Sequence, residues 1–166
     1  MELIVGGKGQ GKLDLVLART GISREQVCDG SNCPLDRIPD QPVVNRLHLL
    51  VRRLLEDGQD PLVYIHRLIE ERPDLIVVSD EIGCGVVPVS GFEREWREAA
   101  GRACCLVACH ACRVERIIAG IPIMIKGGVT IGDFFDPARP DTGQYRTKVH
   151  WAHRSAALPG RCRLLL

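Results

Sequence analysis

The chain has 166 residues, of which 45% are hydrophobic and 26% charged, and its formal net charge is +1. These values predict one globular domain, and the small charge together with 4% aromatic residues argues against a protein that recruits nucleic acid or anionic membranes. No apolar run is long enough to span a membrane, and the first residues lack the basic segment of a signal peptide, so we expect a cytoplasmic protein. Its eight cysteines are then expected to be reduced.

The first thirteen residues have the order of a phosphate-binding loop. An apolar run at residues 2–5 predicts a strand, GGKGQGK follows at residues 6–12, and residues 13–18 have helical spacing. Glycines let backbone N–H groups turn toward a phosphate, the helix N-terminus attracts the anion, and a lysine neutralises it. The candidate nucleotide-binding residues are Gly6, Gly7, Lys8, Gly9, Gln10, Gly11, Lys12 and Leu13.

Leu13 departs from this motif, because the position normally carries a serine or threonine hydroxyl that binds Mg²⁺. A glycine-rich turn that binds nothing is the alternative interpretation. The strand before the loop and the helix after it favour phosphate or nucleotide binding.

The remaining elements alternate in a way that predicts a parallel α/β sheet with helices on its flanks. A short strand is predicted at residues 27–28, and prolines mark a loop at residues 28–42. The predicted helices cover residues 47–55, 61–69 and 91–113. A buried strand is predicted at residues 75–78, and a buried strand and turn at residues 116–122, with residues 123–126 after it. From residue 127 both periodicities fade, so we predict a domain at 1–126 and a poorly ordered tail at 127–166.

A second distinctive stretch, VVSDEIGCGVVP at residues 77–88, resembles the corresponding segment of the adenosylcobinamide kinase/adenosylcobinamide-phosphate guanylyltransferase family of cobalamin biosynthesis. The similarity continues at residues 94–102 and at IAGIPIMIK, residues 118–126. With the glycine loop, it covers most of residues 1–126 in the same order.

This resemblance implies a P-loop, RecA-like, three-layer α/β domain. It also implies an enzyme that uses ATP or GTP with Mg²⁺ to phosphorylate the aminopropanol arm of a corrinoid, adenosylcobinamide, and then transfers GMP through a guanylylated histidine. The family assembles as trimers, so the resemblance implies a homo-oligomer.

Three departures from the family pattern bear on activity. Leu13 replaces the hydroxyl, Asn45 stands where the family has an acidic residue, and the segment between the first helix and Pro42 is too short for the helix with the guanylylated histidine. The neighbours of His48 align with another family segment, so we do not assign it that role. We therefore expect the guanylyltransferase activity to be lost.

Asp80 and Glu81 follow a predicted sheet strand, at the edge where ligands gather in such sheets. We expect Lys12 and Glu81 to be catalytic, and Asp80 and Glu81 to hold Mg²⁺ or prepare the attacking hydroxyl. Asp80 occupies a position where the family has asparagine, and we expect it to compensate in part for Leu13 and Asn45. Alternatively, the pair merely caps the following turn.

The cysteines allow a further interpretation. Cys104, Cys105, Cys109 and Cys112 include a metal-ligand spacing, but their apolar neighbours favour a buried helix face. We expect two unpaired thiols at Cys28 and Cys33 and a solvated His66, and Cys84 lies where a reactive thiol would be near the nucleotide.

Two hypotheses of function remain open on the sequence alone. The first is a corrinoid kinase without the guanylyl-transfer step, supported by Lys12 and Glu81. The second is a non-catalytic nucleotide-binding or regulatory protein, supported by Leu13 and Asn45. A cysteine-based metal protein is a third, weaker option.

Overall fold

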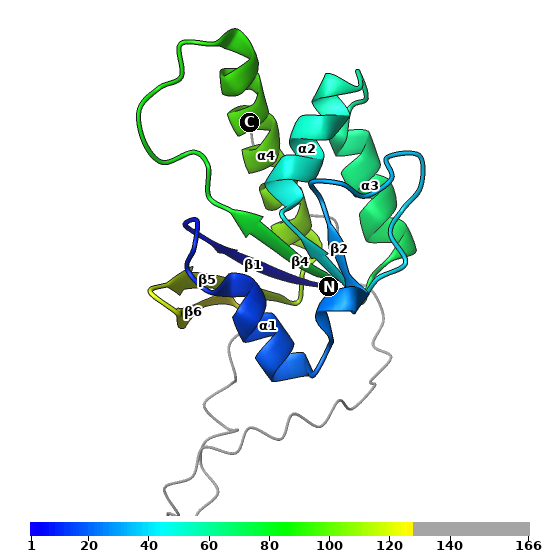
Figure 1. Cartoon of the computed structure of the whole chain (residues 1–166), viewed down its shortest axis with the longest axis vertical. Helices are drawn as coiled ribbons and strands as arrows, with labels where there is room; N and C mark the ends of the chain where they lie inside the picture. Colours follow the sequence, from blue (N-terminus) through cyan, green and yellow to red (C-terminus); the bar gives the residue numbers. More distant parts are fainter. Residues whose placement is uncertain (128–166) are drawn as a thin grey trace, which may run out of the picture. The chain divides into compact units, whose positions relative to one another are not determined.

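The computed structural model describes residues 1–127, which form one six-stranded sheet flanked by helices (Figure 1). The strands are β1 (Glu2–Gly6), β2 (Val27–Asp29), β3 (Val43–Asn45), β4 (Ile76–Asp80), β5 (Arg113–Ile118) and β6 (Ile121–Lys126). The helices are α1 (Lys12–Thr20), α2 (Leu47–Glu56), α3 (Pro61–Glu71) and α4 (Gly91–His110), with a 3₁₀ turn η1 (Arg24–Gln26). The tail predicted at 127–166 lies outside the described residues apart from Gly127.

The sheet has the strand order β2-β3-β4-β1-β5-β6 and is parallel except for β6. After β1 the chain runs to the far edge of the sheet at β2. It then returns through β3 to β4, which lies next to β1. It then crosses to β5 on the other side of β1. The carboxyl ends of β1 and β4 therefore lie side by side at the point where the strand order reverses, which is where ligands bind in open α/β sheets.

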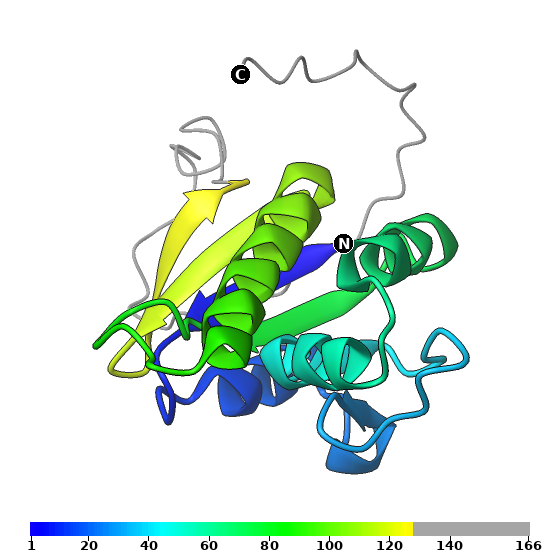
Figure 2. The same cartoon turned by 90° about the horizontal axis from the view of Figure 1, so that it is seen from above.

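Helices cover both faces of the sheet, which confirms the predicted three-layer α/β architecture. Successive residues of a strand point to opposite faces, so β1 sends Leu3 to one core and Ile4 to the other. The Leu3 core contains buried side chains of α2, α3 and α4, which lie next to one another in Figure 2. The Ile4 core contains Val16 of α1.

The predicted helices and strands are present, with three differences. β3 was not predicted as a strand, because only three residues separate Pro42 from Arg46. α4 ends at His110 rather than Arg113, because Cys112 N donates to Met1 O and residue 113 already pairs with β1.

The third difference concerns the buried strand and turn predicted at residues 116–122, where the strand starts earlier, at Arg113, and the turn leads into the second strand of a hairpin. Ala119 and Gly120 both have positive φ, 50° and 81°, and reverse the chain between β5 and β6. A two-residue connection can join only antiparallel strands, so β6 runs against its neighbour. All of β6 is exposed, and it adds one antiparallel edge strand to the otherwise parallel sheet.

The α3 N-terminus shows the expected capping. Asp60 Oδ1 accepts a hydrogen bond of 2.8 Å from Leu62 N, and Pro61 occupies the first turn, where its missing N–H costs no hydrogen bond. His66 is exposed on this helix, as predicted. Within the described residues, no helix is long and apolar enough to cross a membrane.

A buried ion cluster attaches α1 to the sheet. Arg19 of α1 donates to Glu2 Oε2 of β1 and to Glu115 Oε2 of β5, both at 2.7 Å, and Arg113 also pairs with Glu115. Burial raises the pKa of Glu115, but the hydrogen bonds from Arg113 and Arg19 outweigh it, and the net pKa is lowered. The cluster therefore stabilises the fold only while Glu115 is ionised.

Glu115→Gln is expected to lower the free energy of unfolding by about 1–3 kcal/mol at neutral pH, because Arg113 loses its carboxylate partner and Arg19 keeps only Glu2. The pKa of Glu115 is lower in the folded state, so this stabilisation is present above the unfolded-state pKa of about 4.3 and is lost as the pH falls through the folded value. Urea unfolding measured over this range should show the two proteins converging in acid. The control is Glu98→Gln, whose exposed i,i+4 pair with Arg102 should contribute little. Equal losses in the two variants would contradict this role of Glu115.

Candidate functional site: a lysine-centred loop at the switch point of the sheet

The glycine loop runs from the end of β1 to the start of α1. Gly6 has φ 153°, and a Cβ at this position would lie 2.5 Å from Ile117 O of the neighbouring strand β5. Gly11 has φ 77° and is the N-cap of α1. Glycine is therefore required by close packing at the first position and favoured by backbone conformation at the second. The N–H groups of the first turn of α1 have no partners within the helix and lie at the loop.

Lys12 folds into the loop instead of extending into solvent. Its Nζ donates to Gly6 O at 3.1 Å and to Gly7 O at 2.6 Å, and it forms an ion pair with Asp80 Oδ1 at 2.6 Å. Lys12 is only 6% exposed, whereas the Asp80 side chain is 22% exposed. The register of β1 against β4 places Gly6 beside Asp80 and so creates this contact.

His48 supports Asp80 from the other side. It lies in the first turn of α2, where its Nδ1 accepts a hydrogen bond of 3.1 Å from Asp80 N, and its Nε2 lies 3.6 Å from Asp80 Oδ2. An accepting Nδ1 places the ring proton on Nε2, toward the carboxylate. Burial lowers the pKa of His48, and although Asp80 raises it, Lys12 lowers it further, so the ring is neutral. Trp96 of α4 fixes this turn by donating to His48 O at 2.6 Å.

Glu81 lies on the β5 side of the loop. Its backbone N donates to Gly6 O at 3.0 Å, and its Oε2 accepts a hydrogen bond of 3.0 Å from Arg116 Nε. Arg116 Nη2 also lies 3.0 Å from Oε2 in an ion pair. Asp80 and Glu81 thus point to different partners, and each carboxylate is already matched by one cation. A cavity of about 270 Å³ opens beside them and is lined by Gly7, Gln10, Glu81, Cys84, Arg116, Ile117 and Ile118.

The structure therefore brings together most of the predicted site. The loop, Lys12, Asp80 and Glu81 meet at one edge of the sheet, whereas Leu13, half-buried on α1, brings no oxygen ligand. Asn45 ends β3, the strand next to β4. The exposed Cys84 lies in the wall of the cavity.

Sequence reasoning missed His48 and Arg116 as members of the site. Both lie far from the loop in the chain, and only the strand order places the ends of β3 and β5 beside β4 and β1. Arg116 had one usable signal, since it is a charged residue at the start of RIIAGIP, residues 116–122, a run that is otherwise apolar. His48 had none of that kind.

The prediction that the cysteines of residues 104–112 lie on the buried face of a helix is wrong. The helical period turns a different set of residues of α4 to the core, namely Ala100, Ala103 and Val107. Cys105, Cys109 and Cys112 are exposed, and Cys104 is half-buried. Among residues 1–127, no three His, Cys, Asp or Glu side chains are arranged to hold a metal ion, so nothing there supports the cysteine-based metal site.

The comparison with known protein families agrees with this architecture. A model of the cobinamide kinase / cobinamide phosphate guanyltransferase family matches residues 43–125, half of the chain. The match runs from β3 into β6 and includes His48, Asp80, Glu81 and Arg116, whereas the glycine loop precedes it. No curated protein matches the chain. The chain therefore belongs to the cobinamide kinase / cobinamide phosphate guanyltransferase family, whose members act in cobalamin biosynthesis.

Proposed function

We propose that this protein is a nucleotide-dependent kinase that phosphorylates adenosylcobinamide or a related corrinoid precursor. The observation that carries the proposal is the burial of Lys12 in the glycine loop, opposite Asp80, at the switch point of the sheet. A buried ammonium group surrounded by loop carbonyls can reach a phosphate without first being drawn in from solvent. The family match supports the transferase class from a part of the chain that does not contain the loop.

The loop residues have distinct parts in this proposal. Backbone N–H groups of residues 6–13 would surround the phosphates of ATP or GTP, and Lys12 would bind the outer ones. Phosphoryl transfer needs positioning and charge neutralisation more than covalent catalysis. Glu81, held by Arg116 at the cavity, would orient or deprotonate the attacking hydroxyl.

Asp80 is the residue we propose as the main protein ligand for Mg²⁺. Mg²⁺ takes oxygen ligands and keeps several waters, so one or two carboxylates with the phosphates are a sufficient set, and Leu13 adds nothing to it. Bound to the nucleotide, Mg²⁺ would neutralise phosphate charge. Lys12 would exchange its contact with Asp80 for the phosphates and so free the carboxylate, with Glu81 next to it.

The guanylyl-transfer step is proposed to be absent. That step needs a histidine with an accessible nucleophilic nitrogen, but residues 1–47 contain no histidine. The first one, His48, is buried, its Nδ1 accepts from Asp80 N, and its Nε2 faces Asp80 Oδ2. We therefore propose that His48 positions Asp80.

A non-catalytic nucleotide-binding or regulatory protein is the second candidate. Two observations favour it: Leu13 has no hydroxyl for Mg²⁺, and both acidic residues already pair with cations. Nucleotide binding without Mg²⁺ dependence and without turnover would be its signature.

The two candidates are separated by titrating ATP and GTP into the protein by calorimetry with and without Mg²⁺, and then assaying phosphate transfer from the tighter nucleotide to cobinamide. Mg²⁺-dependent binding followed by corrinoid phosphorylation supports the kinase. Binding without phosphorylation supports the second candidate, and the absence of binding refutes both.

Asp80→Asn is expected to weaken the Mg²⁺ dependence of nucleotide binding by roughly tenfold, since it removes one charged oxygen ligand. Calorimetric titrations with and without Mg²⁺ measure this directly. The matched control is Asp74→Asn, an exposed acid in the turn before β4. An unchanged Mg²⁺ dependence in the Asp80 variant would refute its assignment as a ligand.

The homo-oligomer, a trimer by the resemblance, stays a prediction. The same holds for the cytoplasmic location and for the expectation that neither nucleic acid nor membrane is a partner.

A further inference from the structure

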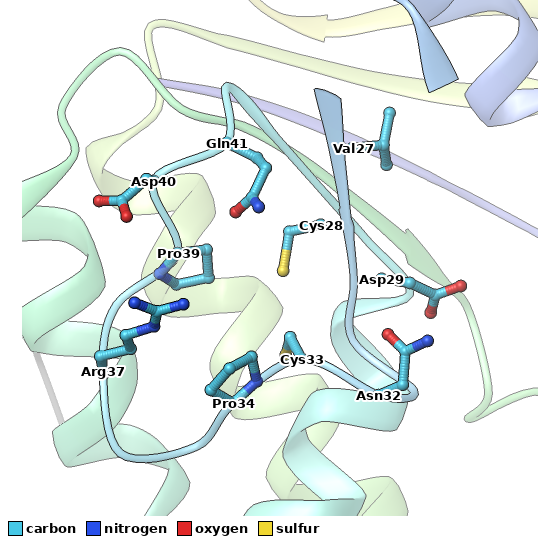
Figure 3. A pocket seen from close by; sticks show the side chains of 10 residues that line it. All are labelled: Val27, Cys28, Asp29, Asn32, Cys33, Pro34, Arg37, Pro39, Asp40 and Gln41. Carbon is cyan, nitrogen blue, oxygen red and sulfur yellow. The ribbon is translucent and has the colours of Figure 1, made fainter. Parts of the chain in front are cut away.

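A second, larger cavity contains two buried cysteines. Its volume is about 360 Å³, and it lies at the β2 edge of the sheet, away from the glycine loop (Figure 3). Cys28 belongs to β2 and Cys33 to the following turn, and each is 5% exposed. In Figure 3 the Cys28 side chain points toward Cys33 within the cavity wall.

The turn between the two residues holds them together. Asn32 N and Cys33 N both donate to Asp29 O, at 3.1 and 2.9 Å, so the chain folds back directly after Cys28. The Asp29 carboxylate completes the turn by accepting from Ser31 N at 2.9 Å and from Ser31 Oγ at 2.7 Å. The two thiols are both free and lie close enough to influence each other's ionisation.

Arg53 of α2 fixes the turn and adds positive charge beside one sulfur. Its Nη1 donates to Cys33 O at 2.7 Å, to Gly30 O at 3.3 Å and to Cys33 Sγ at 3.8 Å. Because Arg53 makes all three contacts through one nitrogen, its positive charge lies directly against the turn that carries Cys33.

The two sulfurs have different protonation states because of these neighbours. The neighbouring Cys28 thiol lowers the pKa of Cys33 to about 7, with burial opposing and Arg53 assisting. The neighbouring Cys33, burial and the negative charge of Asp29 raise the pKa of Cys28, with Arg53 opposing. The buried Tyr64 also faces the pair, and burial raises its pKa, so it remains neutral. Cys33 is therefore the thiol that ionises more readily, whereas Cys28 stays protonated near neutral pH.

We propose that Cys28 and Cys33 form a reversible dithiol–disulfide site that reacts with low-molecular-weight disulfides entering the cavity. The Cys33 thiolate attacks one sulfur of the small disulfide, whose S–S bond breaks and releases one thiolate. Cys28 then gives its proton to solvent and attacks Cys33 Sγ, which displaces the second thiolate and closes the protein disulfide. Counted from the dithiol form, in which Cys33 first loses its proton, the protein gives up two electrons and two protons, and these convert the small disulfide to two thiols.

The other described cysteines lack this arrangement. Cys84, Cys105, Cys109 and Cys112 are exposed, and burial raises the pKa of Cys104. Among residues 1–127 only Cys28 and Cys33 combine a neighbouring thiol held by the same turn, an adjacent arginine and a cavity. The site is remote from the proposed nucleotide loop, so its test is independent of the proposed kinase activity.

The experiment uses the wild-type full chain equilibrated with reduced and oxidised glutathione. The reaction is quenched with acid, free thiols are alkylated, and tryptic peptides are weighed by mass spectrometry. Cleavage after Arg24 and Arg37 gives one peptide, residues 25–37, that contains Cys28 and Cys33 and no other cysteine. We expect this peptide to become unreactive toward alkylation and lighter by two hydrogen atoms, as an internal disulfide requires.

Dilution separates an internal disulfide from a glutathione adduct. Diluting the glutathione buffer tenfold at a constant ratio of its two forms should raise the oxidised-to-reduced ratio of peptide 25–37 about tenfold, because its oxidation releases two glutathione thiols from one disulfide. The occupancy of an adduct does not change on such dilution. Residues 68–94 contain only Cys84 and provide the internal control, for which we expect the adduct behaviour.

Cys28→Ser completes the test. It should leave Cys33 as a lasting glutathione adduct, since the resolving thiol is gone, while circular dichroism verifies the fold. Two adducts on the wild-type peptide 25–37 would overturn the proposal. Full alkylation of this peptide under conditions that modify Cys84 would also overturn it.

Discussion

Replacing Lys12 by alanine is expected to reduce the affinity for ATP or GTP by about 10- to 100-fold, and to abolish phosphorylation of cobinamide. A hydrogen bond to a charged group contributes about 1.5–3 kcal/mol, and each 1.4 kcal/mol changes a dissociation constant tenfold. The ammonium group of Lys12 lies inside the loop, within 3.1 Å of the carbonyl oxygens of Gly6 and Gly7. Among the described residues, no other side chain donates a hydrogen bond to these two carbonyls. Isothermal titration calorimetry measures the change in affinity.

Two comparisons make this result specific to the loop. Arg67→Ala removes an exposed cation on α3, where it pairs with Glu71, and should leave nucleotide affinity unchanged. Lys12→Met keeps the length and packing of the side chain, so it separates the loss of charge from the loss of volume. Since either Lys12 variant leaves Asp80 without its ion-pair partner, thermal unfolding is followed in parallel. A Lys12→Ala protein that is folded and binds nucleotide as tightly as wild type would show that the loop is only a turn.

Gly6→Ala is expected to lower the free energy of unfolding by roughly 2–4 kcal/mol, combining backbone strain with overpacking. The new Cβ would lie 2.5 Å from Ile117 O, a backbone atom of the paired strand β5 that cannot rotate away. Relief requires β1 and β5 to separate at the point where the loop begins. Chemical denaturation measures the loss of stability, and calorimetry should show weaker nucleotide binding because the loop is displaced.

The control for this effect is Gly58→Ala. Gly58 has φ 73°, but no heavy atom lies within 4 Å of the position that a Cβ would take there, so its substitution costs only the left-handed conformation, about 1–2 kcal/mol. A larger loss at Gly6 isolates the contribution of the close approach to β5. Equal losses of stability in the two variants would mean that β5 moves away from the new Cβ without lowering the free energy of unfolding.

Local patterns along the chain were enough to predict most of the elements. The apolar run before the loop, the i, i+3, i+4 spacing of residues 47–55 and the Asp60-Pro61 start of α3 each depend on neighbours within one or two turns. For that reason the sequence alone predicted the layers of the fold, and also that Lys12 and Asp80 would lie at the same edge.

What the sequence could not predict depends on which strands are neighbours. His48 enters the site only because β3 lies beside β4, and Arg116 only because β5 lies beside β1. The exposed β6 has the composition of a buried strand, so its position at the edge overrides its apolar residues. The cysteines of α4 give a second example within one helix. The sequence pattern did not predict which face of α4 is buried, because a small rotation of the helix about its axis changes that face.

The position of β1 in the sheet has a consequence for the order of folding. Glu2 pairs with Ile76 on one side and with Arg113 on the other, so β1 gains its partners only long after it has been synthesised. Contacts this distant in sequence carry a high loop-closure cost and slow folding. On the ribosome, β1 and the glycine loop must wait for β4 and then β5 to emerge, whereas the α2–α3 region can form from local contacts. Nucleotide binding should therefore appear late in synthesis, as a sign that the sheet is complete.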